Sequence, residues 1–275
     1  MKNTLRLIES WVRVLLAMVW TVLVGVPFVL IAYPRYLVGL IGFALGRPAM
    51  LDRAIARNLD TFELVSRDFW SRGIFVLTRM SFHAHAETPV DWKRTHVICA
   101  NHTSVFDIFA VMSAIPVPVR FVAKRELAKW PIVGWSLRPA GQILVDRGNR
   151  DKAIRSISEA DVEAIRGQVI FFVEGTRSRD GALLPFKKGA FHFALANQLP
   201  LLPTAIGGAH TALARRAWWN IHPGSEIQVE FCDPIEVPPA WPEEDRGMLV
   251  EKLREQTRKT ISEALSRGEA KRSAA

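Results

Sequence analysis

The chain has 275 residues, which is enough for one large domain with an appendage. Its hydrophobic fraction of 49% is too low for a protein made mostly of membrane spans and high for one without membrane contact. The net charge of +9 favours phosphates of nucleic acid or anionic lipid, and the apolar N-terminus favours lipid. Two cysteines, Cys99 and Cys232, exclude a disulfide framework and fit a reduced cytosolic setting.

Residues 14–34 contain no charged side chain and, as a helix, would reach across about 30 Å of hydrocarbon. A second apolar stretch at 36–45 is too short to span, and Pro27 and Pro34 are expected to kink or break the helical path. We predict a membrane-embedded helical hairpin, or one span plus an interfacial helix, within residues 1–48. A buried core helix is an alternative. A cleaved signal peptide is disfavoured because the apolar region is too long and no A-x-A site follows it.

The rest of the chain, residues 49–275, is predicted to be one α/β domain that ends in an amphipathic helix. Residues 50–85 have a mixed polar and apolar pattern that indicates helix. Short apolar runs then alternate with helical patterns, which implies a mostly parallel sheet flanked by helices. The predicted strands are 96–100, 119–123, 142–146, 168–173, 199–206 and 226–232, and the predicted helices are 104–115, 130–137, 150–167, 189–198 and a charged helix from about residue 243.

The segment "ANHTSVFDIF" (100–109) places a histidine and a carboxylate five positions apart, directly after a predicted strand. In one interpretation Asp107 completes a helix capping box that begins at Ser104 and has only a structural role. In the other, Asp107 in the first helical turn holds one ring nitrogen of His102, which leaves the other nitrogen free as a base. No G-x-S-x-G occurs, so the nucleophile would then be a hydroxyl of the substrate.

Cations follow several of the predicted strands. Lys124, Arg147 and Arg177 each come after an apolar run, and Lys188 precedes the helix at 189–198. Ligands of parallel sheets bind at the carboxyl ends of the strands, and the planar guanidinium group suits phosphate. Each residue can also be an ordinary solvated loop charge. Because they recur beside a histidine and an acid, we predict a phosphate-binding site there, with Glu174 orienting Arg177 or pairing with it.

Four blocks of the sequence resemble, in order, those of a known family. "NHTSVFD", "GQILVDR", "FFVEGTRS" and "LLPTAI" are similar to the motifs of the 1-acyl-glycerol-3-phosphate (lysophosphatidic acid) acyltransferases and their glycerolipid acyltransferase relatives. "AKREL" and "WPIVGW" also resemble runs in that family. The likeness covers roughly residues 80–210. Val173 stands where the family usually has proline, and Thr204 where an aliphatic residue is commoner.

The resemblance implies transfer of a fatty acyl group from acyl-CoA or acyl-acyl carrier protein to the sn-2 hydroxyl of lysophosphatidic acid. The product would be phosphatidic acid, for phospholipid biosynthesis. His102 would be the general base and Asp107 its orienting acid. The substrate-binding residues would be Arg147, Glu174, Gly175, Thr176, Arg177, Lys124 and Lys188. Backbone N–H groups at the start of the following helix can supply oxyanion stabilisation. No metal or other cofactor is expected.

The expected partners are a membrane lysolipid, an acyl thioester on coenzyme A or acyl carrier protein and an anionic bilayer surface, but no nucleic acid. The expected location is the cytoplasmic face of the inner (plasma) membrane. Two alternatives remain: an acyltransferase for another lysophospholipid or lyso-aminolipid, and a non-catalytic protein that binds anionic lipid. Trp130 and Trp135 are either interfacial anchors or core residues, and we favour the core. Trp218 and Trp219 are predicted to form a membrane-touching patch beside two arginines.

Overall fold

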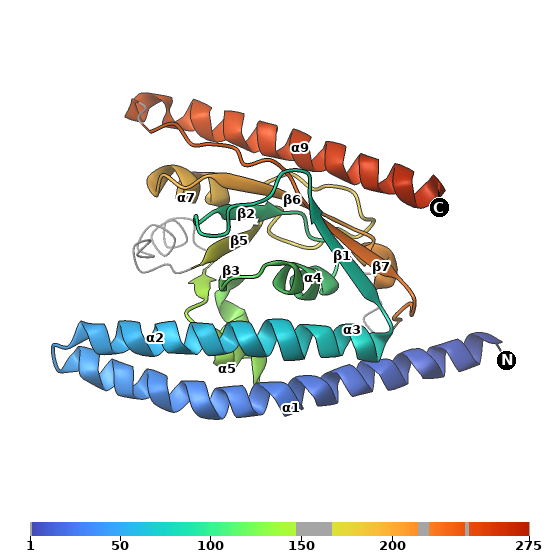
Figure 1. Ribbon diagram of the computed structural model, residues 1–275, viewed down its shortest axis with the longest axis horizontal. Coiled ribbons are helices and arrows are strands. Elements are labelled where there is room, and N and C mark those ends of the chain that lie inside the picture. The colour runs from blue at the N-terminus through green and yellow to red at the C-terminus, as the bar shows by residue number, and fades with distance from the viewer. Residues whose placement is uncertain (1, 147–166, 214–219, 240–241, 275) are drawn as a thin grey trace.

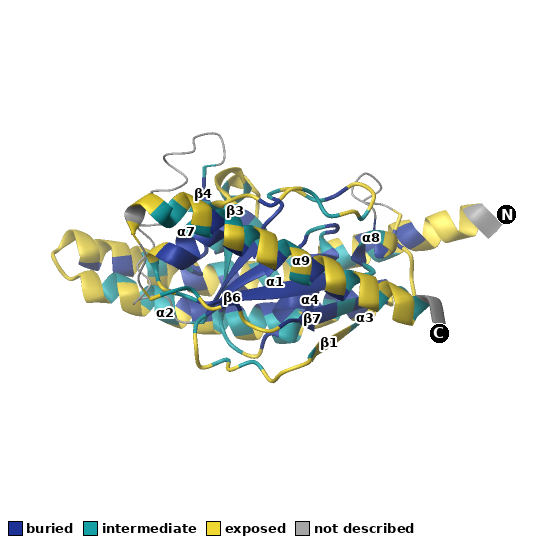
Figure 2. Cartoon of the chain, turned by 90° about the horizontal axis from the view of Figure 1, so that it is seen from above, coloured by how far each residue is buried: buried dark blue, intermediate teal, exposed yellow. Residues whose placement is uncertain are grey.

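The computed structural model describes residues 2–146, 167–213, 220–239 and 242–274. A pair of long helical segments lies along one side, a twisted sheet lies in the middle, and helices α7 (Gly189–Ala196) and α9 (Arg246–Ala274) cover the opposite side (Figure 1). In Figure 2 the sheet is buried, whereas much of the first helix is exposed.

The N-terminal hairpin consists of α1 (Lys2–Ala44) and a second arm made of α2 (Pro48–Glu63), the π-helical segment η1 (Leu64–Ser71) and α3 (Arg72–Thr78). A hairpin is therefore present, but its second arm begins only at residue 48, and residues 36–44 are the last turns of α1 and not a second helix. The chain reverses at Gly46, which has a φ of 74°. Pro27 and Pro34 do not break α1, because both rings are exposed and each removes only one backbone hydrogen bond. The boundary placed after residue 48 stays a prediction.

Close contacts hold the two arms together. A Cβ at Gly39 would lie 3.0 Å from the Cα of Leu51, and the indole of Trp20 lies against Gly73. Trp20 Nε1 donates to the carbonyl oxygen of Phe69 at 3.1 Å. These contacts place the outer face of α1 away from the rest of the protein.

The sheet has seven strands in the order β1-β7-β6-β2-β5-β3-β4, and every neighbouring pair except β6–β7 is parallel. The strands are β1 (Ser81–Ala86), β2 (Val97–Ala100), β3 (Val119–Lys124), β4 (Ile143–Val145), β5 (Gln168–Phe172), β6 (Leu201–Gly207) and β7 (Glu226–Phe231). The prediction of a mostly parallel sheet flanked by helices is confirmed.

Strand β1 was missed because its residues fall in the stretch predicted as helix from 50 to 85. The sequence "SFHAHA" alternates, but Phe82 is its only large apolar residue, and β1 is an edge strand that leaves most of its side chains exposed. Its identity depends on pairing with β7, more than a hundred residues later. The helix predicted at 150–167 falls almost wholly on residues that the structure does not describe.

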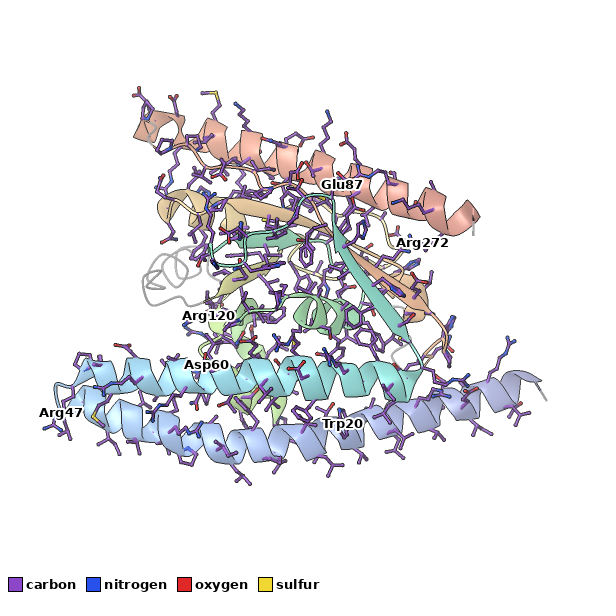
Figure 3. All side chains as sticks on the ribbon, in the orientation of Figure 1. Trp20, Arg47, Asp60, Glu87, Arg120 and Arg272 are labelled. Carbon is purple, nitrogen blue, oxygen red and sulfur yellow. The ribbon has the colours of Figure 1, made fainter. Side chains whose placement is uncertain are left out.

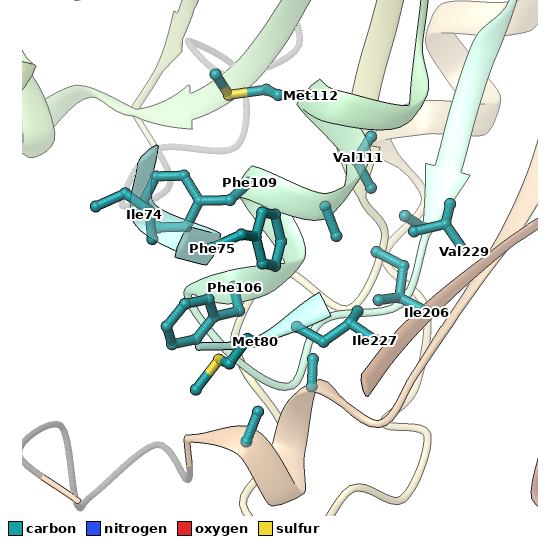
Figure 4. Packing of buried hydrophobic residues seen from close by; sticks show 14 of the residues in the cluster. Ile74, Phe75, Met80, Phe106, Phe109, Val111, Met112, Ile206, Ile227 and Val229 are labelled. Atoms are coloured by element: carbon teal, nitrogen blue, oxygen red, sulfur yellow. The ribbon is translucent and has the colours of Figure 1, made fainter. Parts of the chain in front are cut away.

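Two hydrophobic clusters fill the faces of the sheet. On the hairpin side, Phe75 of α3 packs with Phe106 and Phe109 of helix α4 (Phe106–Ala114), near Met80 and Ile227 (Figure 4). The other face packs against α7 and α9. The buried residues of α9 recur at helical spacing, as the predicted amphipathic helix requires: Val250, Leu253, Thr257, Ile261 and Ala264.

Three short helices complete the described chain: η2 (Arg125–Lys129), α5 (Val133–Leu137) and α8 (Ala209–Ala212), with one further turn, η3 (Glu243–Asp245), before α9. The prediction that Trp130 and Trp135 are core residues is wrong, because they are 62% and 51% exposed. Ile132 instead packs on Gly25 of α1, which leaves both indoles pointing outward. Trp218 and Trp219 lie outside the described residues.

Candidate active site

His102 lies two residues beyond the carboxyl end of β2, in the loop that leads into α4. Its Nδ1 is 2.8 Å from Oδ2 of Asp107, which is fully buried in the first turn of α4. A carboxylate can only accept a hydrogen bond, so Nδ1 of the neutral ring carries the proton. Nε2 is then the basic nitrogen. The predicted His102–Asp107 pair is therefore present in the geometry that leaves one nitrogen for chemistry.

The same carboxylate oxygen of Asp107 also accepts the backbone N–H of Thr103 at 2.6 Å and of Ser104 at 2.8 Å. One oxygen of Asp107 therefore contacts both the His102 ring, as the orienting interpretation requires, and the N–H of Ser104, as the capping interpretation requires. The N–H groups of Thr103 and Ser104 are donated to Asp107, so these two cannot stabilise an oxyanion.

The imidazole is held flat against an aromatic ring. His102 stacks on Phe172 at the end of β5, with ring centroids 4.1 Å apart and planes inclined by 21°. The side chain keeps 15% of its accessible surface. The ring is therefore fixed in orientation and still reachable by a substrate.

Asn101 fixes the strand end that carries the histidine. Its Nδ2 donates to the carbonyl oxygen of Ile206 at 2.9 Å, and its Oδ1 accepts the N–H of Ile206 at 2.7 Å. The amide thus continues the pairing of β2 with β6 past the last strand residue. Asn101 was in the quoted motif, but its role was not predicted because the partner lies 105 residues away.

Glu174 does not have the role that the sequence indicated. It is 1% exposed, its Oε1 accepts the backbone N–H of His102 at 3.0 Å, and its Oε2 accepts that of Leu184 at 3.2 Å. Burial raises the pKa of Glu174 to about 7, although both hydrogen bonds and the nearby Arg258 act in the opposite direction. The carboxyl group therefore ties the loop of His102 to the loop after β5.

The loop after β5 runs alongside the histidine. Gly175 has a φ of 72°, a conformation that favours glycine, and Ser178 donates its N–H to the carbonyl oxygen of His102 at 2.7 Å. Arg177 precedes Ser178, so its backbone lies beside the loop of His102. Thr176 is exposed on the same turn. The structure thus brings three of the predicted binding residues, Gly175, Thr176 and Arg177, to the His102 loop.

The predicted lysines are placed differently. Lys124 is half exposed and pairs with Glu126 at 3.2 Å, whereas Lys188 forms an ion pair with Glu251 of α9. Lys187 lies closer to the loop, since a Cβ at Gly175 would be 3.3 Å from its Cγ. The sequence contains both lysines in "PFKKG", and only the tertiary contact distinguishes them. Arg147 lies outside the described residues.

Comparison with known proteins adds evidence from sequence and fold. Residues 79–207 match the model of a family described as "Acyltransferase". This stretch, a little under half of the chain, therefore resembles an acyltransferase domain. The resemblance predicted from the four motif blocks is confirmed.

The similar proteins include several acyltransferases with curated names. The 1-acyl-sn-glycerol-3-phosphate acyltransferase of Limnanthes douglasii is 38% identical over 60% of this chain and 56% of its own length. The enzyme of that name from Escherichia coli is 34% identical over 51% of this chain and 57% of its own length. The 1-acyl-sn-glycerol-3-phosphate acyltransferase alpha of Mus musculus is 32% identical over 59% of this chain and 55% of its own length. The chain thus spans a little over half the length of these relatives.

One solved structure is similar over most of the length of this chain. It is the crystal structure of the 1-acyl-sn-glycerophosphate (LPA) acyltransferase PlsC from Thermotoga maritima, with a TM-score of 0.59 and 23% identity. The match covers 90% of this chain and 96% of that one. At this identity the likeness establishes the fold, including the N-terminal helices that the family match does not reach.

Proposed function

We propose that this protein transfers a fatty acyl group from a thioester to the sn-2 hydroxyl of lysophosphatidic acid, which yields phosphatidic acid. The observation that carries the proposal is the buried Asp107 held on Nδ1 of a reachable His102, inside an acyltransferase-family domain. Relatives bearing the name 1-acyl-sn-glycerol-3-phosphate acyltransferase support the choice of acceptor.

In the proposed reaction Nε2 of His102 takes the proton of the acceptor hydroxyl as its oxygen attacks the thioester carbonyl. The tetrahedral intermediate then collapses, the carbon–sulfur bond breaks, and the thiolate of coenzyme A or acyl carrier protein leaves and takes up the proton. Asp107 stabilises the imidazolium that forms between the two steps. A general base of this kind contributes about 10²- to 10⁴-fold in rate. No residue of the chain is acylated, and no cofactor is required.

The acceptor phosphate is assigned to the side of the site formed by the loop after β5. Arg177 supplies a guanidinium fork there, and Gly175 lets the backbone approach closely. We include Arg147 because of the family resemblance, and Lys187 because its side chain lies close to Gly175. A phosphate held by these cations would bring the neighbouring hydroxyl to Nε2.

We further propose that the protein lies on one face of a membrane. Among the described residues, α1 is the one helix long and apolar enough to cross a bilayer. However, the second arm packs beside α1 and carries charges that include Arg57, Asp60 and Arg67. Carrying them through hydrocarbon would cost several kcal/mol, so α1 is better placed in the interface with its outer face in the acyl chains. The cytoplasmic face of the inner membrane fits the thioester donors.

The test is turnover of the full-length protein with labelled acyl-CoA or acyl-acyl carrier protein and a panel of lysolipid acceptors. His102→Ala should lower acyl transfer to lysophosphatidic acid by about 10²- to 10⁴-fold while the protein stays folded and membrane-bound. His83→Ala is the matched control, because His83 is exposed on the edge strand β1. Undiminished turnover in His102→Ala would refute the mechanism. Faster acylation of another lysophospholipid or a lyso-aminolipid would refute the acceptor.

A further inference from the structure

A hollow lies at the β3–β4 edge of the sheet, against the hairpin. Its volume is about 410 Å³, in the range of small-molecule sites. Its described lining comes from both arms of the hairpin and from the sheet edge: Tyr36, Ile55, Arg120, Arg125, Arg138, Gly141, Gln142 and Leu144. Figure 3 shows Arg120 above α2, on the side of the sheet away from β1. None of the predicted active-site residues that the structure describes lines this hollow, so it is separate from the His102–Asp107 pair.

The charged side chains among the described lining residues of this pocket are all positive. Three arginines and no Asp or Glu are found among its described lining residues. Arg120 is partly buried and donates to the carbonyl oxygen of Gly141 at 3.3 Å, which fixes its position. Arg125 and Arg138 are exposed, and within the described parts of the chain neither guanidinium group has an ion-pair partner. Guanidinium groups that converge on an open hollow are suited to a phosphate, which accepts paired hydrogen bonds.

The position of the pocket beside the apolar surface of α1 indicates that the phosphate belongs to a lipid headgroup. Tyr36 belongs to α1, whose exposed apolar residues continue on both sides of it at Ile31, Leu37 and Leu40. Tyrosine and arginine are the residues that proteins place at the headgroup level of a membrane. Trp130 and Trp135, in the segment between Arg125 and Arg138, are exposed as interfacial tryptophans are.

We propose that the pocket of Arg120, Arg125 and Arg138 binds the phosphate of an anionic lipid headgroup at the membrane surface. The bound lipid is not the acyl acceptor, because the pocket is apart from His102. It orients the domain on the bilayer. The proposal rests on the interfacial placement of the hairpin given under the proposed function.

The test separates a shaped site from diffuse attraction by keeping the charge constant. Arg125→Lys with Arg138→Lys preserves both charges and removes both guanidinium forks, and Arg53→Lys with Arg57→Lys does the same to two exposed arginines of α2 outside the pocket. Binding of each full-length variant is measured on vesicles of phosphatidylcholine, with and without phosphatidylglycerol. The pocket variant should lose about tenfold in affinity for the phosphatidylglycerol vesicles only, and the α2 variant should match the wild type.

Equal affinity of the wild type and the pocket variant for the phosphatidylglycerol vesicles would overturn the proposal. A competition experiment with soluble glycerol 3-phosphate tests whether the bound phosphate belongs to a lipid. If it displaces the wild type from these vesicles, the pocket takes a soluble phosphate ester and the lipid assignment is wrong. Acyl transfer in detergent micelles should be the same for the wild type and the pocket variant. If the proposed function is wrong, neither protein will transfer acyl groups in micelles, whereas the difference in vesicle binding will remain.

Discussion

The carboxyl group of Glu174 provides a test of how the active-site loops are held. It is buried between two backbone N–H donors, those of His102 and Leu184, and burial raises its pKa to about 7 from 4.5. Between these pH values the folded state holds the proton more tightly than the unfolded state. The contribution of Glu174 to stability is therefore greatest below pH 4.5 and is lost as the pH rises through about 7.

Glu174→Gln removes this titration and keeps the shape. The interval from 4.5 to about 7 corresponds to at most about 3 kcal/mol. We therefore compare the free energy of unfolding of the wild type with that of Glu174→Gln at each pH. The difference, wild type minus variant, should fall by up to about 3 kcal/mol as the pH rises from 4.5 to about 7. Denaturant unfolding in detergent, followed by the fluorescence of the nine tryptophans, measures this difference. Glu263→Gln is the control, since Glu263 is 56% exposed and its difference should stay within about 0.5 kcal/mol at every pH. A wild-type minus Glu174→Gln difference that does not change with pH would refute the reasoning.

Kinetics of the same variant decide between two roles for Glu174. An amide offers one acceptor oxygen to two N–H donors, so the loop of His102 should shift and kcat should fall by about tenfold. The KM for lysophosphatidic acid should stay unchanged, because the carboxyl group faces backbone donors and not the substrate. A raised KM with normal kcat would instead support the phosphate-binding role that the sequence indicated.

Two further substitutions test the catalytic pair and the hairpin. Asp107→Asn keeps an acceptor oxygen but removes the charge, so kcat/KM should fall by about 10²- to 10⁴-fold in the turnover assay, and near-normal turnover would contradict the orienting role. Gly73→Ala places a Cβ about 2.1 Å from Nε1 of Trp20, so denaturant unfolding should show a loss of about 1 to 3 kcal/mol. Gly247→Ala is its control, because nothing lies within 4 Å of the added Cβ and the helix should gain up to about 1 kcal/mol. Equal stability of the two glycine variants would show that the indole contact does not hold the hairpin.

The elements that the sequence predicted well are those with a strong local pattern. The apolar runs of β2, β5 and β6 are buried on both faces, so they read as continuous hydrophobic segments with clear ends. The edge strand β1 has no such pattern, because most of its side chains face solvent and only its pairing with β7 makes it a strand. The turn of the hairpin was misplaced for a related reason. Prolines in an exposed helix face break few contacts, so they did not end α1.

The residue types and spacing of "NHTSVFD" were enough to predict the strand–loop–helix and to offer Asp107 as the partner of His102, because the two residues are only five positions apart. Only the tertiary structure decided which groups surround that pair. Glu174 meets the backbone of His102 72 residues away, and Asn101 meets Ile206 105 residues away. Arg120, Arg125 and Arg138 line one pocket only because the sheet edge packs on the hairpin. Local spacing specifies contacts within a helical turn, whereas contacts between distant strand ends depend on the order in which the strands pair.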